Sequence, residues 1–210
     1  MINVEKVTKH FDDFTALKEI SCTIREGCIY GMVGSNGAGK STLMKILSGV
    51  YTRDSGSVEI FGKEYGDLTP KQAQALGVAI IHQELNLCSH LSVAENIFLG
   101  QEIVKGGVVQ RKQMNDEARA ILKRLSLEIE PETLVGSLSV SKQQMIEIAK
   151  ALLHKARVLI MDEPTSSISQ NEIEMLYDFI RALKRENITI IIITHKLDEV
   201  YTIADEVTVL

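Results

Sequence analysis

The feature that most constrains the fold is a glycine-rich loop between an apolar run and a segment of helical composition. The loop covers residues 34–42 and reads Gly-Ser-Asn-Gly-Ala-Gly-Lys-Ser-Thr, the apolar run covers residues 28–33, and the helical segment begins at Thr42. A strand, a loop of this pattern and a helix form the context that binds phosphate. Glycines let the backbone curl so that its N–H groups converge on phosphate oxygens, and the helix start adds partial positive charge. The sequence therefore predicts a site for a nucleoside triphosphate.

Two polar residues of this loop have predicted chemical roles. Lys40 brings a positive charge to the β- and γ-phosphates, and Ser41 offers a hydroxyl ligand to Mg²⁺. We expect every residue of the loop to contact the nucleotide: Gly34, Ser35, Asn36, Gly37, Ala38, Gly39, Lys40, Ser41 and Thr42. A glycine-rich turn that matches the pattern by accident is the alternative, and the correct flanking segments argue against it.

The rest of the chain alternates between strand-like and helix-like patterns. Strands are expected where apolar residues alternate with polar ones or form short runs, at residues 2–8, 19–25, 57–61, 77–81, 157–161, 189–193 and 207–210. From about residue 92 to residue 154 the apolar spacing becomes helical, and it begins with the capping box of Ser92 and Glu95. Apolar strands that alternate with helices predict an α/β fold, in which a mostly parallel sheet is covered on both faces.

Composition narrows the classes of function. The chain has 210 residues, is 45% hydrophobic and has a net charge of −5, so it can bury a core but offers no basic face for nucleic acid. The apolar stretch Ile190–Ile193 is far too short to span a bilayer, and the chain opens without a signal-peptide pattern. The three cysteines, Cys22, Cys28 and Cys88, are scattered, which favours reduced thiols in a cytosol. Because the net charge is negative, phosphate binding should depend on the dipoles and charges of the loop itself and not on the overall charge of the chain.

Two acidic residues follow a buried strand. Asp162 and Glu163 come directly after the apolar residues 158–161. Reactive groups of parallel sheets gather at the carboxyl ends of the strands, so both side chains should face the phosphate loop. Asp162 suits the Mg²⁺ shell, usually through water, and Glu163 suits polarising the attacking water. The competing interpretation is a pair that merely caps the next helix, and the presence of the phosphate loop weakens it.

Gln83 and His195 also follow apolar runs, at residues 78–81 and 190–193. Taken alone, a glutamine at a strand end is normally a solvated loop residue. A histidine at a strand end is more often a hydrogen-bonded structural residue than a catalytic one. Only the order of these residues in the chain gives them a functional interpretation.

That order resembles the ATP-binding cassette (ABC) family of ATPases. The phosphate loop, Gln83, the segment Leu138–Met145, the Asp162–Glu163 pair and His195 follow one another as they do in that family. The resemblance extends over essentially the whole chain. It implies that the bound species are ATP and Mg²⁺.

The resemblance also implies roles for single residues. Phe11 falls where the family stacks an aromatic ring on adenine, Gln83 at the loop that reports to a membrane partner, and His195 at the contact with the γ-phosphate. The implied metal-site residues are Ser41, Gln83 and Asp162. The implied catalytic residues are Lys40, Glu163 and His195.

An architecture follows from the same resemblance. It consists of a P-loop NTPase (RecA-like) core with a mostly parallel sheet, an antiparallel β subdomain and an inserted α-helical subdomain. Residues 1–210 are expected to form one ABC ATPase domain, with the core and β subdomain in residues 1–91 and 155–210 and the helical subdomain in residues 92–154. The chain stops at Leu210, where such a cassette would continue, so we expect an amino-terminal cassette or fragment of a two-cassette chain.

One motif departs from the family pattern. The family signature is Leu-Ser-Gly-Gly-Gln, whereas Val140, Ser141 and Lys142 follow Leu138 and Ser139 here. Four other segments resemble the first cassette of bacterial importers of ribose- and galactose-type monosaccharides: residues 82–87, 94–100, 143–150 and 166–169. Two cassettes of the family close head to tail, with each ATP between one phosphate loop and the opposite signature. Because the altered signature should serve the ATP of the opposite cassette poorly, we expect one working hydrolytic site per pair. For the same reason we expect the isolated chain to be a monomer with weak ATPase activity.

The branch implies partners and a location. The expected partners are a transmembrane permease subunit that docks near residues 83–98, a second ABC cassette and, indirectly, a periplasmic or extracellular sugar-binding protein. Nucleic acid is not among the expected partners. The expected location is the cytoplasmic face of the bacterial inner membrane. An exporter cassette, a soluble ABC protein of ribosomes or DNA, and a nucleotide-gated module without turnover remain alternatives.

Overall fold

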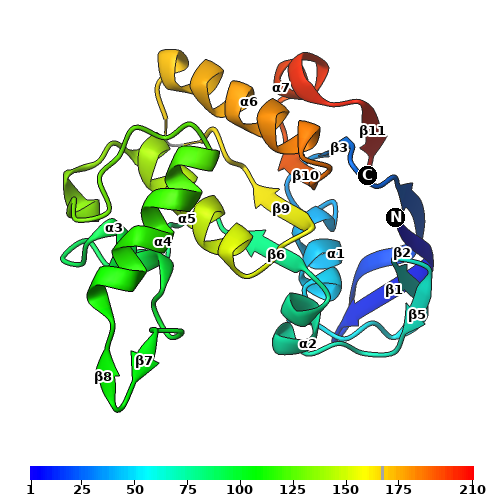
Figure 1. The fold of residues 1–210 in the computed structure, drawn as a ribbon. Coiled ribbons are helices and arrows are strands. Elements are labelled where there is room, and N and C mark those ends of the chain that lie inside the picture. Colours follow the sequence, from blue (N-terminus) through cyan, green and yellow to red (C-terminus); the bar gives the residue numbers. More distant parts are fainter. Residues whose placement is uncertain (167) are drawn as a thin grey trace. The chain divides into compact units, whose positions relative to one another are not determined.

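Two compact units make up the part of the chain that the structure, a computed structural model, describes, namely residues 1–166 and 168–210 (Figure 1). Unit 1 contains residues 1–83, 156–166 and 183–210. Unit 2 contains residues 84–155 and the described residues between Ser166 and Leu183. Within the described residues, no helix combines the length and apolar character that crossing a membrane requires.

A five-stranded parallel sheet forms one layer of unit 1. Its strand order is β11 (Glu206–Val209), β3 (Ile29–Val33), β10 (Thr189–Thr194), β9 (Val158–Asp162) and β6 (Val78–Ile81). Every residue of β3 and of β10 is buried, which explains the apolar runs at the centre of these strands. The helices that belong wholly to this unit are α1 (Lys40–Leu47), α2 (Pro70–Ala75) and α7 (Leu197–Ile203).

A four-stranded antiparallel sheet forms the second layer of unit 1. Its order is β2 (Phe14–Ile24), β1 (Ile2–Phe11), β4 (Ser55–Ile60) and β5 (Lys63–Tyr65). One face buries alternate apolar residues such as Val4 and Leu17 in a common core with Leu43 and Met44 of α1. Helix α1 therefore shares a core with the antiparallel sheet.

Unit 2 is mainly helical. Its elements are α3 (Val93–Ile97), the hairpin of β7 (Val104–Lys105) and β8 (Val108–Val109), α4 (Arg111–Arg124), a 3₁₀ turn η1 (Val135–Ser137), α5 (Val140–Leu153) and most of α6 (Gln170–Arg185). The predicted capping box is present, because Ser92 Oγ accepts from the N–H of Glu95 at 3.2 Å and the Glu95 carboxylate accepts from the N–H of Ser92 at 2.9 Å.

The predicted fold class is confirmed, with a parallel sheet, an antiparallel sheet and a helical part. Some boundaries differ from those expected. Strand β1 extends to Phe11 and β2 begins at Phe14, because irregular pairing interrupts the period of two: register shifts follow Val4 and Val7, and Lys6 has a positive φ of 46°. The sequence pattern also did not predict the short hairpin formed by β7 and β8.

Unit 2 also includes the segment that directly follows Gln83. The segment after Gln83 is hydrogen-bonded within unit 2: the backbone N–H of Asn86 donates to Glu147 of α5 at 2.6 Å, and that of Cys88 donates to Oδ1 of Asn96 at 2.8 Å. The contact between Asn86 and Glu147 joins residues 61 positions apart, so a change of local sequence pattern does not mark the start of this unit.

Candidate functional site

The glycine-rich loop connects β3 to α1 and has the backbone that its sequence predicts. Gly37 and Gly39 have φ angles of +88° and +90°, a region that side chains with a Cβ disfavour. A Cβ at Gly39 would also lie 2.4 Å from the carbonyl oxygen of Ala16 in β2, whereas a Cβ at Gly37 would meet nothing within 4 Å. Gly39 is thus closely packed against β2, and Gly37 faces open space.

Lys40 is the first residue of α1 and is 6% exposed. Its Nζ donates to the carbonyl oxygens of Gly34 at 2.7 Å and Ser35 at 2.9 Å. Among the residues that the structure describes, no carboxylate forms an ion pair with Lys40. A buried ammonium group without a counter-charge favours an anion beside it, so the loop fits a phosphate group.

Ser41 and Asp162 come together across unit 1. The Ser41 hydroxyl donates to Oδ2 of Asp162 at 3.2 Å, and Asp162 is the last residue of β9. A hydroxyl oxygen and a carboxylate oxygen at this separation are ligands of the kind that Mg²⁺ takes, together with phosphate oxygens and water. The two residues therefore fit a magnesium ion.

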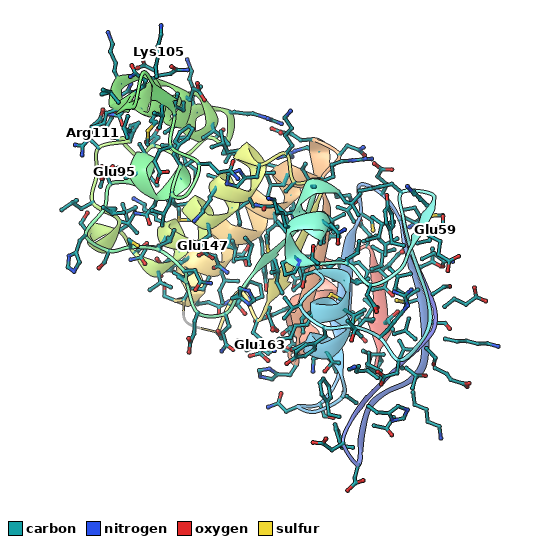
Figure 2. All side chains as sticks on the ribbon, turned by 90° about the horizontal axis from the view of Figure 1, so that it is seen from below. Glu59, Glu95, Lys105, Arg111, Glu147 and Glu163 are labelled. Atoms are coloured by element: carbon teal, nitrogen blue, oxygen red, sulfur yellow. The ribbon has the colours of Figure 1, made fainter. Side chains whose placement is uncertain are left out.

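Glu163 and His195 form a second pair, at the carboxyl ends of β9 and β10. Figure 2 labels Glu163, which lies beside α1. The carboxylate Oε1 of Glu163 lies 2.8 Å from Nδ1 of His195, which follows the end of β10. Glu163 has a φ of +47°, and its backbone N–H donates to the carbonyl of Ile193 at 2.9 Å. A non-glycine residue in this region costs about 1–3 kcal/mol, and such strain concentrates at functional sites.

These groups surround one cavity in unit 1 of about 520 Å³, a volume in the range of small-ligand sites. Its lining residues are Phe14, Ala16, Asn36, Gly37, Ala38, Gly39, Lys40, Ser41, Thr42, Gln83, Asp162, Glu163 and Ile193. The cavity thus brings together most of the predicted loop residues with the predicted Gln83, Asp162 and Glu163. Gln83 also donates to the hydroxyl of Ser166 at 3.4 Å. The individual roles of these residues stay predictions.

Four predicted residues do not line the cavity. The ring of Phe11 makes an edge contact with Tyr51 at 5.2 Å between centroids, and Lys9 Nζ lies 5.4 Å from the same ring. Gly34 and Ser35 hold Lys40 through their carbonyls, and His195 is connected to the cavity through Glu163.

Phe14 and Ala16 are lining residues that the sequence analysis missed. Both belong to β2, and Phe14 is 59% exposed although it is aromatic. The available signal was an aromatic residue three positions after Phe11. That signal was hard to interpret because the approach of β2 to Gly39 is a tertiary contact.

The segment at residues 138–142, which departs from the family signature, lies in unit 2. Its serines form a hydrogen-bond network with Glu172. The Ser141 hydroxyl, which is buried, donates to Oε1 of Glu172 at 2.6 Å, and the Ser139 and Ser141 hydroxyl oxygens are 3.0 Å apart. The Ser169 hydroxyl and N–H donate to Oε2 of Glu172 at 2.7 and 3.3 Å. These donors, of which Ser141 is the strongest, lower the pKa of Glu172 to about 2.

This depressed pKa predicts how stability depends on pH. Because the folded pKa of about 2 lies below the ordinary value of 4.5, the carboxylate stabilises the fold above about pH 4.5, and this contribution is lost as pH falls towards 2. We expect Glu172→Gln to have a lower melting temperature than the unmodified chain at pH 6, and the difference to shrink between pH 4.5 and pH 2. Thermal unfolding followed by circular dichroism measures this. Glu174→Gln, at an exposed position of the same helix, is the matched control. A pH-independent difference would contradict the assignment.

The family of this chain follows from its match to a protein-family model. The family model described as ABC transporter matches residues 17–166, which is more than two thirds of the chain. The chain belongs to this family. The matched residues include the phosphate loop, Gln83 and the Asp162–Glu163 pair.

Curated relatives are similar to this ABC chain along its whole length. It is 44% identical to the ribose import ATP-binding protein RbsA of Shouchella clausii over 212 residues, and 41% identical to the galactose/methyl galactoside import ATP-binding protein MglA of Treponema denticola over 210 residues. It is 48% identical to a putative ribose/galactose/methyl galactoside import ATP-binding protein of Agrobacterium fabrum. The chain is covered completely in each case, but it spans only 42% of the length of these relatives.

Solved structures of ABC cassettes have the same fold. A structure of MJ1267, an ATP-binding cassette of an ABC transporter, superposes with a TM-score of 0.89 at 26% identity, covering 100% of this chain and 87% of that one. The cassette cbiO1 of Clostridium perfringens gives a TM-score of 0.85 at 28% identity, covering 99% of this chain and 83% of that one.

Proposed function

We propose that this chain is an ATP-binding and ATP-hydrolysing cassette that energises import of a monosaccharide across the bacterial inner membrane. The observation that supports the chemistry best is the single cavity lined by the phosphate loop, Asp162 and Glu163. Import of a monosaccharide is supported by the relatives, which are named as ribose or galactose import ATP-binding proteins.

Binding of ATP depends on the loop. Backbone N–H groups at the start of α1 and the Lys40 ammonium group hold the β- and γ-phosphates. Ser41, Asp162 and Gln83 would hold Mg²⁺, which when bound would neutralise charge on the phosphates. Phe14 and Ala16 of β2 line the cavity on the side of Gly39. Phe11 is proposed to stack on adenine.

Hydrolysis depends on Glu163 and His195. The Glu163 carboxylate accepts a hydrogen bond from the attacking water and draws its proton away while the oxygen attacks the γ-phosphorus and the bond to the leaving ADP breaks. His195 is hydrogen-bonded to the Glu163 carboxylate at 2.8 Å, and we propose that it also contacts the γ-phosphate. Both residues lie at carboxyl ends of parallel strands, where α/β proteins place reactive groups.

Transport requires further chains. We infer a permease subunit that docks near residues 83–98, a second ABC cassette and, through the permease, a sugar-binding protein. The chain is proposed to act at the cytoplasmic face of the membrane. The single ABC ATPase domain of residues 1–210, with a helical subdomain at residues 92–154, is part of the same proposal. Its signature is proposed to serve the partner's ATP poorly, because Ser139 and Ser141 are engaged with Glu172.

Turnover and association of the isolated chain test this proposal. We expect slow release of phosphate from ATP that stops when EDTA removes Mg²⁺, and a monomer in light scattering with and without ATP. Absence of any Mg²⁺-dependent release would contradict the enzymatic proposal, and a stable ATP-dependent homodimer would contradict the defective signature. With the permease in vesicles, ATP-driven accumulation of a monosaccharide on the side opposite the cassette would contradict import and favour an exporter.

A further inference from the structure

A buried carboxylate outside the cavity connects the two loops that hold Glu163 and His195. Glu199 lies in the first turn of α7 and is 9% exposed. Its Oε1 accepts from the hydroxyl of Thr165 and lies 3.0 Å from Nζ of Lys196, and its Oε2 accepts from the hydroxyl of Thr194 at 3.0 Å. All of these residues belong to unit 1.

The partners of Glu199 flank the hydrolytic pair in sequence. Thr165 is two residues after Glu163, and Thr194 and Lys196 lie on either side of His195. Thr194 also accepts from the backbone N–H of Lys196 at 3.0 Å. A carboxylate can only accept, so both threonine hydroxyls must donate to it, and their orientations are fixed. One side chain thus fixes the backbone beside both Glu163 and His195.

Such a connection is needed because the hydrolytic pair spans two loops. Within the described residues, the side chains of Glu163 and His195 are joined by one 2.8 Å hydrogen bond, and both side chains are partly exposed. The backbone of Glu163 is in the left-handed region, a conformation that persists only where surrounding contacts hold it. The Thr165–Glu199–Thr194 connection supplies contacts of this kind.

Stabilisation of α7 alone does not explain Glu199. Asp198 occupies the neighbouring position of the same turn, where its charge favours the helix start while it stays exposed. Burying a second carboxylate is unfavourable unless several donors compensate for its lost hydration. The donors here come from the two loops at the cavity.

We propose that Glu199 is a positioning residue for ATP hydrolysis, which holds the loops of Glu163 and His195 in one arrangement through Thr165 and Thr194. The inference rests on the proposed function for its kinetic consequence. Its structural consequence, the geometry of the Glu163–His195 hydrogen bond, can be measured without nucleotide.

Glu199→Gln tests the proposal, with Asp198→Asn as the control that removes the same charge from the same turn. We expect the maximal rate of phosphate release by the Mg²⁺-ATP-loaded chain to fall about 10- to 100-fold in Glu199→Gln, with the KM for ATP changed less than about threefold, as for residues that orient a reacting group. Asp198→Asn should keep the unmodified rate. In nitrogen-15 NMR spectra of the nucleotide-free chain, the Nδ1 resonance of His195 should move only in Glu199→Gln.

A second pair of variants keeps the test independent of the folding of Glu199→Gln. Thr165→Val removes the hydroxyl at nearly constant shape, and Thr165→Ser keeps it. We expect the slower rate and the altered His195 resonance in Thr165→Val, and recovery of both in Thr165→Ser. An unchanged His195 resonance in both Glu199→Gln and Thr165→Val would overturn the proposal, as would an equal loss of rate in Asp198→Asn. If the unmodified chain shows no turnover, the proposed function fails, while the resonance still decides whether Glu199 positions His195.

Discussion

Glu163→Gln is expected to bind ATP with nearly the affinity of the unmodified chain and to hydrolyse it about 10²- to 10⁴-fold more slowly. The substitution keeps the shape of the side chain and the strained backbone at this position, but the amide cannot take up the proton of the attacking water. Lys40, Ser41 and Asp162 are unchanged, so the phosphate cradle survives. Single-turnover phosphate release and titration with a fluorescent ATP analogue measure the two quantities separately.

The control for this experiment is Glu59→Gln, which makes the same chemical change in strand β4 of the antiparallel sheet (Figure 2). Glu59 does not line the cavity, so both rate and affinity should stay as they are. Hydrolysis by Glu163→Gln at close to the unmodified rate would remove Glu163 from the role of water-polarising group.

Lys40→Ala should weaken ATP binding about 10- to 100-fold, as expected for loss of a charge-assisted hydrogen bond to phosphate. The ammonium group is buried and bonded to the carbonyls of Gly34 and Ser35, so it is held in the loop before the phosphate arrives. ATP that binds the folded state also raises the melting temperature, and this shift should be much smaller in Lys40→Ala at equal ATP concentration. Isothermal titration calorimetry and thermal unfolding with added Mg²⁺-ATP are the measurements.

Lys45→Ala is the matched control on the same helix. Lys45 Nζ lies 5.2 Å from the centre of the Tyr51 ring, and the residue does not line the cavity. Its replacement removes an equal charge from α1 but should leave the ATP affinity within about twofold of the unmodified value, the change expected from a distant surface charge. Equal affinity in Lys40→Ala and Lys45→Ala would refute the assignment of Lys40.

The parts of the fold and site that depend on local sequence were predictable. Strands β3 and β10 are buried at every residue, so burial itself demands continuous apolar runs that sequence analysis detects. The phosphate loop is one contiguous segment whose backbone depends on its own glycines. Asp162 and Glu163 follow from the rule that parallel strands place reactive groups at their carboxyl ends.

Features that depend on tertiary contacts were not predictable. Phe14 lines the cavity because β2 approaches Gly39, and the hydrogen bond between Glu199 of α7 and Thr165 joins residues 34 positions apart. The extent of β1 was hidden by irregular pairing around Lys6. In each case the deciding partner is distant in sequence, and no local period reports it.

The left-handed backbone of Glu163 implies a trade-off between local relaxation and reach. Asp and Asn adopt this region more readily than Glu, so a shorter acid would relieve part of the strain. A shorter side chain would, however, withdraw its carboxylate from His195 by about the length of one methylene group, roughly 1.5 Å, the C–C distance along a chain. The turn after β9 is therefore more strained than the same turn with Asp or Asn at position 163. A substitution that relieved this strain should also slow the proposed ATP hydrolysis.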